Sequence, residues 1–326
     1  MRRWLQQQWY RLGPWHVLLI PLSWLFNVVA LVRRLAYQSG LLPSCRLPVP
    51  VIVVGNISVG GTGKTPLAVW LAENLRQQGF HPALISRGYG VNIHGVMSVD
   101  ATSDPALVGD EPLLLARRTC CPVWVGRDRP QAALALLEAY PQCDVIISDD
   151  GLQHYRLQRD FEIVVIDGDR GVGNGRLLPA GPLRETAARL KTVDAVVVNG
   201  GNGQYPDAFA MQLKAENFRN LQDSGRIATA TDFAGQAIYA IAGIGSPARF
   251  FRQLRHLGLQ FSQRAFPDHH AFSVADLQVK NAQAILMTEK DAVKCAAFAQ
   301  DNWWYLPVDA VVDQALITRI LDKLRK

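Results

Sequence analysis

The chain has 326 residues, of which 49% are hydrophobic, so it is long and apolar enough for two domains with a sizeable core. Its net charge of +6 comes entirely from residues 1–46, which contain six arginines and no acidic residue. The charge-balanced remainder argues against nucleic-acid binding, and the basic N-terminus favours anionic lipid over RNA because the rest of that segment is apolar. Five cysteines without a C-x-x-C pair indicate reduced thiols in the cytosol.

The N-terminal segment contains a long apolar stretch that predicts a helix. Within residues 14–32 only His16, Ser23 and Asn27 are polar, and together with Arg34 they fall on one narrow stripe of a helix. A helix of this length extends ~28 Å, which is borderline for crossing a ~30 Å hydrocarbon core.

Three interpretations of this helix are open. An interfacial helix, with its polar stripe towards the protein body or the headgroups, is favoured. A single-pass anchor is the second, although arginines at both ends give no positive-inside asymmetry, and a buried soluble helix is the third. A cleaved signal peptide is disfavoured because no small-residue cleavage site follows. The interfacial interpretation also rests on the flanking tryptophans Trp4, Trp9, Trp15 and Trp24.

A hydrophobic strand followed by a glycine-rich loop comes next. Residues 49–54 are typical of a strand buried on both faces of a parallel sheet. The loop departs from G-x-x-x-x-G-K-[ST] only where Ser58 replaces the first glycine. Its glycines would let backbone amides face a phosphate, Lys64 would contact the β and γ phosphates, and Thr65 would contact magnesium. A glycine-rich turn without a ligand is the alternative. The phosphate-binding candidates are Ser58, Val59, Gly60, Gly61, Thr62, Gly63, Lys64 and Thr65.

Two polar positions follow at the ends of further elements. A helix over residues 66–78 leads to a second strand, whose carboxyl end carries Arg87 and Tyr89. Open α/β sheets bind ligands at this edge, although a turn arginine and a packed tyrosine explain the same pattern. Asp110 and Glu111 then begin a helix, where carboxylates also serve simply as caps.

The third and fourth predicted strands also end in charged residues. An aspartate at the end of a hydrophobic strand, downstream of a phosphate loop, is where a magnesium-ordering carboxylate is expected. The residues that follow these two strands are Arg127 and Arg129, and then Asp149, Asp150, Gln153 and His154.

Two more strands complete an alternating β/α pattern, with the loop 181–185 between them. The second of these strands ends at Asn199, which is followed by two glycines. A common GTPase would carry Asn-Lys-x-Asp at this point, so the sequence favours ATP over GTP.

These patterns predict an α/β fold with a mostly parallel sheet of the P-loop NTPase type. Its expected segments are a basic, apolar helix in 1–46, a P-loop kinase domain in 47–205, a linker in 206–229 and a smaller α/β domain in 230–326. In the smaller domain, Asp268, His269 and His270 suit acid–base chemistry or metal binding, and a surface turn is the alternative.

Seven motifs, in this order, resemble the tetraacyldisaccharide 4'-kinase family of lipid A biosynthesis: GNISVGGTGKTP, SRGYG, GDEP, DDGLQH, LLPAGPLRE, FPDHH and TEKD. The likeness covers nearly the whole chain. It implies transfer of the γ-phosphoryl group of MgATP to the 4'-hydroxyl of an acylated disaccharide 1-phosphate, at the cytosolic face of the inner membrane. The expected cofactors are ATP and Mg²⁺, and the expected partners are the lipid substrate and membrane lipid, with no nucleic acid and no obligate protein partner.

The resemblance also implies roles for single residues. Asp110 and His269 would form an acid–base dyad and Lys64 would be the third catalytic residue, with His270 left open as the alternative partner of Asp110. Since the dyad spans both domains, closure would complete it and limit wasteful ATP hydrolysis. The metal candidates are Thr65, Glu111, Asp149 and Asp150. The substrate candidates are Arg87, Tyr89, Arg129, Gln153 and Arg184.

Two other functions compete with a kinase. A P-loop ATPase driving transport or metal insertion would call for Cys/His ligand pairs or a coupling helix, and the sequence displays neither. A nucleotide-gated membrane switch would tolerate loss of Asp110 for partner binding, whereas a kinase would not tolerate that loss for turnover.

Overall fold

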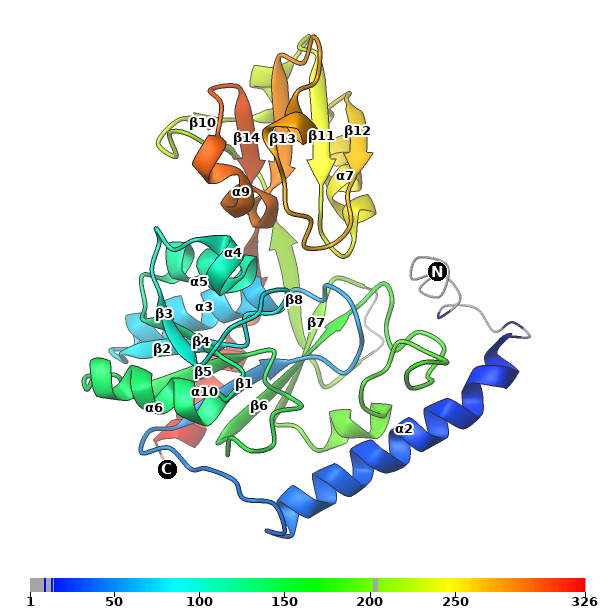
Figure 1. Ribbon diagram of the computed structural model, residues 1–326, viewed down its shortest axis with the longest axis vertical. Coiled ribbons are helices and arrows are strands. Elements are labelled where there is room, and N and C mark those ends of the chain that lie inside the picture. Colours follow the sequence, from blue (N-terminus) through cyan, green and yellow to red (C-terminus); the bar gives the residue numbers. More distant parts are fainter. Residues whose placement is uncertain (1–8, 10–12, 14, 202–204, 326) are drawn as a thin grey trace.

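The structure of the protein is a computed structural model that describes residues 9, 13, 15–201 and 205–325. Two α/β domains lie one above the other in Figure 1, and the helix α2 (Trp15–Gln38) runs along the lower one. The lower domain contains a nine-stranded sheet and the upper one a six-stranded sheet. The predicted fold class is confirmed. Four of the basic and aromatic residues on which the prediction of a lipid-binding N-terminus rests lie outside the described residues: Arg2, Arg3, Trp4 and Arg11.

The larger sheet is parallel in its centre and antiparallel at both edges. In sheet order its strands are β15 (Asp309–Val312), β8 (Phe209–Lys214), β7 (Ala195–Asn199), β6 (Phe161–Asp167), β1 (Val51–Gly55), β5 (Val145–Asp149), β2 (Pro82–Ser86), β4 (Val123–Gly126) and β3 (Val96–Val99). The edge strands β3 and β15 run antiparallel to their neighbours, and the strands between them pair in parallel. Every residue of β1, β2 and β5 is buried, as expected for strands covered on both faces.

Helices cover both faces of this sheet and explain its β-branched strands. They are α3 (Lys64–Gln77), α4 (Pro105–Val108), α5 (Asp110–Thr119), α6 (Arg129–Ala139), α10 (Ala315–Leu324) and the 3₁₀ helix η1 (Ala187–Lys191). Along β1, Ile52 and Val54 pack on the face covered by α3, whereas Val51 and Val53 pack on the face covered by α6. This alternation follows from the two-residue period of a strand, and each such buried side chain contributes roughly 1.5–3 kcal/mol.

The smaller domain is a second sheet with its own core. Its strands, in sheet order, are β10 (Ile227–Ala228), β9 (Phe218–Asn220), β14 (Trp303–Leu306), β13 (Ala284–Thr288), β11 (Ile238–Ala242) and β12 (Ser262–Ala265). Its helical elements are η2 (Ala230–Phe233), α7 (Pro247–His256), α8 (Val274–Leu277), α9 (Glu289–Cys295) and η3 (Ala296–Phe298). Apolar clusters on both faces of the central strands hold it together.

The structure differs from the predicted domain boundaries at two places. Part of the predicted linker 206–229 forms β8, which extends the larger sheet beside β7, and Met211 of β8 is buried in its core. The chain also returns to the larger domain at its end, where β15 pairs with β8 and α10 packs near α3. The reason is burial: the apolar face of α10, including Leu316 and Ile320, completes the core over α3. The two domains are therefore joined by two chain crossings.

Helix α2 docks on the larger domain through its polar stripe. The Ser23 hydroxyl donates to the carbonyl of Leu177 at 2.6 Å and accepts from the amide of Ala180 at 3.1 Å. Arg34 donates to the Thr192 hydroxyl at 3.4 Å. The helix continues past the predicted end to Gln38, which makes it ~36 Å long. The predicted stripe is thus confirmed for its described side chains, and it faces the protein body.

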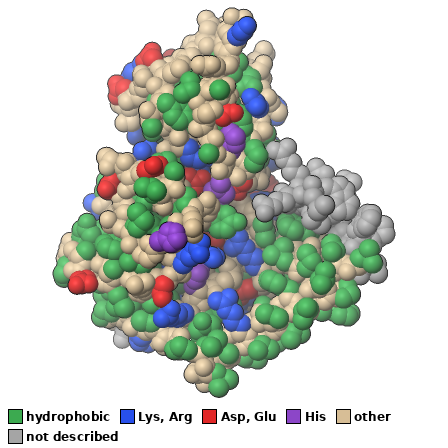
Figure 2. Space-filling model, viewed as in Figure 1, with side chains coloured by type: hydrophobic (Ala, Val, Ile, Leu, Met, Phe, Trp, Pro, Cys, Tyr) green, Lys and Arg blue, Asp and Glu red, His purple; other side chains and the backbone are tan. Residues whose placement is uncertain are grey.

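The remaining surface of α2 is apolar and exposed. Among the described residues this is the one helix long and apolar enough to cross a membrane, and only 6% of its apolar window is buried. The interpretation as a buried soluble helix is therefore wrong. Figure 2 shows hydrophobic side chains covering the part of the surface where α2 lies. The most exposed of them are Leu18, Trp24, Leu25, Val28, Val29 and Val32.

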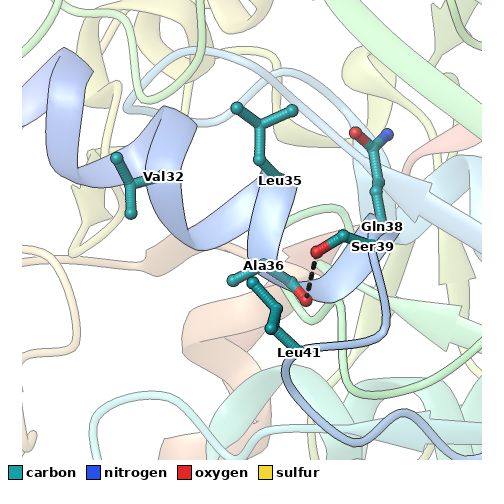
Figure 3. A pocket seen from close by; sticks show the side chains of 6 residues that line it. All are labelled: Val32, Leu35, Ala36, Gln38, Ser39 and Leu41. Atoms are coloured by element: carbon teal, nitrogen blue, oxygen red, sulfur yellow. Dashed lines mark hydrogen bonds between the residues drawn. The ribbon is translucent and has the colours of Figure 1, made fainter.

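An open hollow of about 440 Å³ continues this apolar surface at the C-terminal end of α2. Figure 3 shows its lining, in which the Ser39 hydroxyl donates to the carbonyl of Ala36. The hollow is lined by Val32, Leu35, Ala36, Gln38, Ser39 and Leu41. It lies on the helix and not at the strand ends, so it belongs to the exposed apolar surface of α2.

Candidate active site

The phosphate loop connects the buried strand β1 to the first turn of α3. Gly60 and Gly63 have positive φ angles of 114° and 99°, which only glycine adopts readily. The loop starts in extended backbone: Ser58 forms an antiparallel bridge with Leu183, and the amide of Val59 donates to the carbonyl of Pro182 at 2.8 Å. Extended backbone accepts a serine, which explains the departure from the usual glycine.

Two side chains that the sequence reasoning did not identify hold this loop in shape. The buried amide of Asn199, at the end of β7, donates to the carbonyl of Thr62 at 3.0 Å. It lies so close to the chain that a Cβ on Gly63 would be 2.8 Å from it. Arg170, which follows β6, donates to the carbonyl of Gly61. Asn199 ends β7 and Arg170 follows β6, so a position at the carboxyl end of a strand is the signal that could have identified both.

The two aspartates at the end of β5 have different environments. Lys64 lies 3.5 Å from Asp150, and Arg184 lies 3.3 Å from the same carboxylate. These cations outweigh burial and hold the pKa of Asp150 below its usual range. Asp149 is buried, and neither of its carboxylate oxygens has a hydrogen-bond partner among the described residues. Burial, reinforced by the charge of Glu111, raises the pKa of Asp149 to about 7.

An unpartnered, buried carboxylate beside a phosphate loop fits a divalent cation. Within the described residues no three His, Cys, Asp or Glu side chains gather closely enough to hold a metal by themselves. The donor set therefore suits Mg²⁺, which usually takes one or two carboxylates and completes its shell with phosphates and water. Asp149 and Thr65 fit this role. Glu111 lies 2.8 Å from Lys290 and Asp150 is paired with Lys64, so both already have cationic partners.

Asp110 and His269 meet across the interface between the two domains. Asp110 begins α5 and is 5% exposed, and the Nδ1 atom of His269 lies 3.1 and 3.2 Å from its two carboxylate oxygens. The hydrogen bond with Asp110 raises the pKa of His269 above its usual value, against burial and the charge of Lys290. His270 instead lies 3.4 Å from Asp276 and stacks on Phe266. His269 is thus the histidine that faces Asp110.

Lys290 completes this cluster at the start of α9. Its ammonium group lies 2.8 Å from Glu111, 3.8 Å from Asp110 and 3.7 Å from Asp268. Burial would lower the pKa of Lys290, but these carboxylates raise it well above its usual value. Burial likewise opposes ionisation of Asp110, yet His269 and Lys290 hold its pKa below its usual range. The cluster therefore presents an ionised carboxylate at neutral pH. Figure 2 shows acidic, basic and histidine side chains gathering where the two domains meet.

The substrate candidates fall into three groups. Tyr89 is exposed and its ring lies 5.2 Å from that of His269, so it joins the dyad, and Arg87 is exposed on the same loop. Arg184 faces Asp150. Gln153 donates to Glu185 at 2.6 Å and to the carbonyl of Asn56 at 3.3 Å, which links two loops of the larger domain.

Arg129 is the one buried residue among the substrate candidates. It is 1% exposed, and its guanidinium donates to the carbonyls of Ile85 and Asp149 and to the hydroxyl of Ser148. Burial lowers the pKa of Arg129 to about 10. Its two terminal nitrogens therefore tie the ends of β2 and β5 together, and a contact with a substrate phosphate stays a prediction.

Comparison with known proteins places this arrangement in a family. The model of the LpxK family, described as tetraacyldisaccharide-1-P 4'-kinase, matches residues 15–325. A tetraacyldisaccharide 4'-kinase of Methylobacillus flagellatus is 52% identical over 327 residues, covering 99% of this chain and 96% of that protein. The corresponding protein of Azoarcus sp. is 52% identical over 322 residues, covering 97% and 94%.

A solved structure agrees with this assignment. The structure of LpxK from Aquifex aeolicus in complex with ATP matches with a TM-score of 0.78 and 28% identity, covering 93% of this chain and 98% of that one. The match spans both domains and not the phosphate loop alone. The chain belongs to the tetraacyldisaccharide-1-P 4'-kinase family.

Proposed function

We propose that this protein transfers the γ-phosphoryl group of MgATP to the 4'-hydroxyl of a tetraacyldisaccharide 1-phosphate, forming lipid IVA. The observation that carries the proposal is the Asp110–His269 pair, which joins a domain with a phosphate loop to a second domain. A transport ATPase or a nucleotide-gated switch is not favoured, because the relatives are kinases that act on a lipid disaccharide.

The larger domain would hold the nucleotide. The amides of the loop and the positive end of α3 suit the β and γ phosphates, and Lys64 adds a cation that now rests against Asp150. Asp149 and Thr65 would hold Mg²⁺, which when bound neutralises charge on the phosphates. The orphaned carboxylate of Asp149 supports this assignment.

Asp110 would receive the proton of the sugar hydroxyl. As the acceptor oxygen bonds to the γ-phosphorus, the bond from that phosphorus to the β–γ bridging oxygen breaks, and the hydroxyl proton passes to the carboxylate. A sugar hydroxyl is a weak acid, so this transfer comes late in the reaction. His269 and Lys290 would keep Asp110 ionised until then, and His269 would fix its orientation.

Groups beside the dyad and beside the end of β5 would receive the disaccharide. Tyr89 beside His269 suits the sugar ring, while Arg87 and Arg184 suit phosphate. Nearby positive charge supports anion binding: burial, together with Arg129 and Arg87, lowers the pKa of His154 to about 3. Gln153 would act through Glu185, to which it donates.

Helix α2 would place the enzyme at the cytosolic face of the inner membrane, lying in the interface. Its buried stripe faces the protein and its exposed apolar face suits the acyl region. Changing Leu25, Val29 and Val32 together to Gln should release the protein from vesicles, while matched changes at the exposed Leu107 and Ile227 should not. Unchanged vesicle binding of the helix variant would argue against this anchor.

The test of the function is a transfer assay. The full chain is incubated with γ-labelled ATP, Mg²⁺ and an acylated glucosamine disaccharide 1-phosphate in mixed micelles. A second phosphate on the 4'-oxygen is expected, identified by fragmentation in a mass spectrometer. Hydrolysis of ATP without a phosphorylated acceptor would contradict the proposal.

A further inference from the structure

The two domains meet at a second charged contact, on the other side of the phosphate loop. Arg249, in the first turn of α7, lies 2.6 Å from Asp167, the last residue of β6. Asp167 is 2% exposed and the Arg249 side chain is 31% exposed. Strand β6 is a direct neighbour of β1, so this contact lies beside the loop that follows β1.

The carboxylate of Asp167 is shared between this contact and the phosphate loop. One oxygen accepts from the Nε atom of Arg170 at 2.8 Å as well as from Arg249, and the other accepts backbone amides of residues 169 and 170. Arg170 in turn donates to the carbonyl of Gly61, and its guanidinium lies where a Cβ on Gly60 would collide, at 2.9 Å. A chain of charged contacts therefore runs from α7 through Asp167 to the loop.

The turn before α7 also lies over the loop. A Cβ built on Gly245 would be 3.7 Å from the amide nitrogen of Gly61 and 3.3 Å from the carboxylate of Asp268. Because Asp268 precedes His269, the same turn lies next to both the phosphate loop and the dyad. The smaller domain thus contacts the nucleotide half of the site through this turn. A small displacement of the turn would change its contacts with both the phosphate loop and the dyad.

Opposite charges hold this contact together. The buried carboxylate of Asp167 faces both arginines, and the more exposed carboxylate of Asp169 lies 4.0 Å from Arg249, so the charges of the group balance. Burial opposes ionisation of Asp167, but Arg170 and Arg249 hold its pKa below its usual range. The carboxylate therefore stays charged, and both arginines remain held at neutral pH.

We infer that Asp167, Arg170 and Arg249 are positioning residues that couple closure of the two domains to the shape of the phosphate loop. This inference rests on the proposed kinase function. Arg249 acts through Asp167 and Arg170 and touches no reacting atom. When the domains close, Arg249 binds Asp167 on one side of the loop, and His269 contacts Asp110 on the other side.

The test uses Arg249→Met, Asp167→Asn and the double variant in the full chain, with Arg252→Met as a matched control from the exposed side of the same helix. Turnover, KM for ATP and for the acceptor, and affinity for a fluorescent ATP analogue are measured. Hydrogen exchange of residues 58–65 is followed without acceptor. Arg249→Lys tests rescue by a conserved charge.

Loss of Arg249 should lower kcat roughly ten- to a hundredfold, because misplacement of the dyad costs rate, and should leave the affinity for nucleotide within about threefold. Exchange in residues 58–65 should rise. The double variant should lose less than the product of the two single losses, since both break the same contact. Arg252→Met should behave like the wild type, and Arg249→Lys should recover part of kcat.

Wild-type kcat and wild-type exchange in Arg249→Met would overturn the inference, as would single losses that multiply in the double variant. A change in melting temperature alone would also overturn it, since it would show a contact that only holds the fold. If the wild type phosphorylates no acceptor, the proposed function fails by itself, and the exchange measurement still decides the coupling.

Discussion

The phosphate loop and the Asp110–His269 pair serve one site but are assembled differently. The loop, Lys64, Asp149 and Asp150 all come from the larger domain, within about one hundred residues of chain. The dyad takes Asp110 from α5 of that domain and His269 from the smaller one, 159 residues apart in sequence. On the proposed mechanism, the nucleotide site would lie mainly in one domain, whereas proton transfer would need both domains in the correct relative position.

On the proposed mechanism, this difference would provide a control on catalysis. A P-loop domain that binds ATP without its acceptor base would be a poor hydrolase, because the second domain completes the dyad that would activate a nucleophile. The separation also predicts which variants damage binding and which damage transfer alone.

The largest difference between the effect on transfer and the effect on nucleotide binding is expected for His269. Changing His269 to Asn should lower kcat roughly a hundred- to a thousandfold, because the group that orients Asp110 and helps to keep it ionised is lost. The affinity for ATP should be unchanged, since His269 belongs to the other domain. Steady-state kinetics and titration with a fluorescent ATP analogue measure both quantities. His270→Asn is the matched control and should remain close to wild type. Equal losses in the two variants would remove the distinction between these histidines.

Arg129 tests the comparison within the larger domain, because its loss should change stability and leave acceptor binding unchanged. Arg129→Met should lower the free energy of unfolding by about 3 kcal/mol, because two carbonyls and a hydroxyl lose a charged donor in the interior. The KM for the lipid acceptor should be unchanged in the folded protein. Chemical denaturation and kinetics separate the two effects, with the exposed Arg127→Met as control. A stable variant with a raised acceptor KM would support the original interpretation of Arg129 as a substrate contact.

A smaller effect is expected for Lys290. Without this cation the pKa of Asp110 should rise, since Lys290 is one of the groups that hold it down. Lys290→Met should then lower kcat roughly tenfold and move the acidic limb of the pH–kcat profile to higher pH. The exposed Lys280→Met serves as control. A uniform loss at every pH, with no movement of the profile, would contradict an electrostatic role.

The smallest expected effect is the pH dependence of stability. The pKa of His269 is raised above its ordinary value of 6.5, so its bond to Asp110 contributes fully below pH 6.5 and is lost as pH rises through the raised pKa. The pKa of Asp110 lies below 3.8, so its contribution is lost only in stronger acid. The melting temperature of the wild type should exceed that of His269→Asn most clearly between these limits. A constant difference from pH 5 to pH 9 would contradict this assignment.

How far the sequence leads depends on the range of the interaction. The phosphate loop and the strand-end aspartates are local patterns, so the sequence predicts their elements and their edge of the sheet. It also predicts Asp110 and the FPDHH histidines, but the choice of His269 over His270 depends on the positive φ of His269 and on how the domains dock.

Contacts between residues that are far apart in the sequence cannot be predicted from local patterns. Residues 209–214 fall within the predicted linker, and their pairing with β7 and β15 is what places them in the larger sheet. Arg129 carries the charge expected of a phosphate ligand, and nothing local indicates that its donors turn inward. Arg249 follows a proline at the start of an ordinary amphipathic helix, and its partner lies 82 residues earlier.

The most direct test of the account compares Lys64→Met with Asp110→Asn in one set of measurements. Nucleotide affinity is determined by titration, and phosphoryl transfer to the acylated disaccharide 1-phosphate is determined by label incorporation. The account predicts that Lys64→Met loses both affinity and transfer, while Asp110→Asn keeps its affinity and loses transfer by roughly a hundred- to ten-thousandfold. An Asp110→Asn variant that retains wild-type transfer would contradict it.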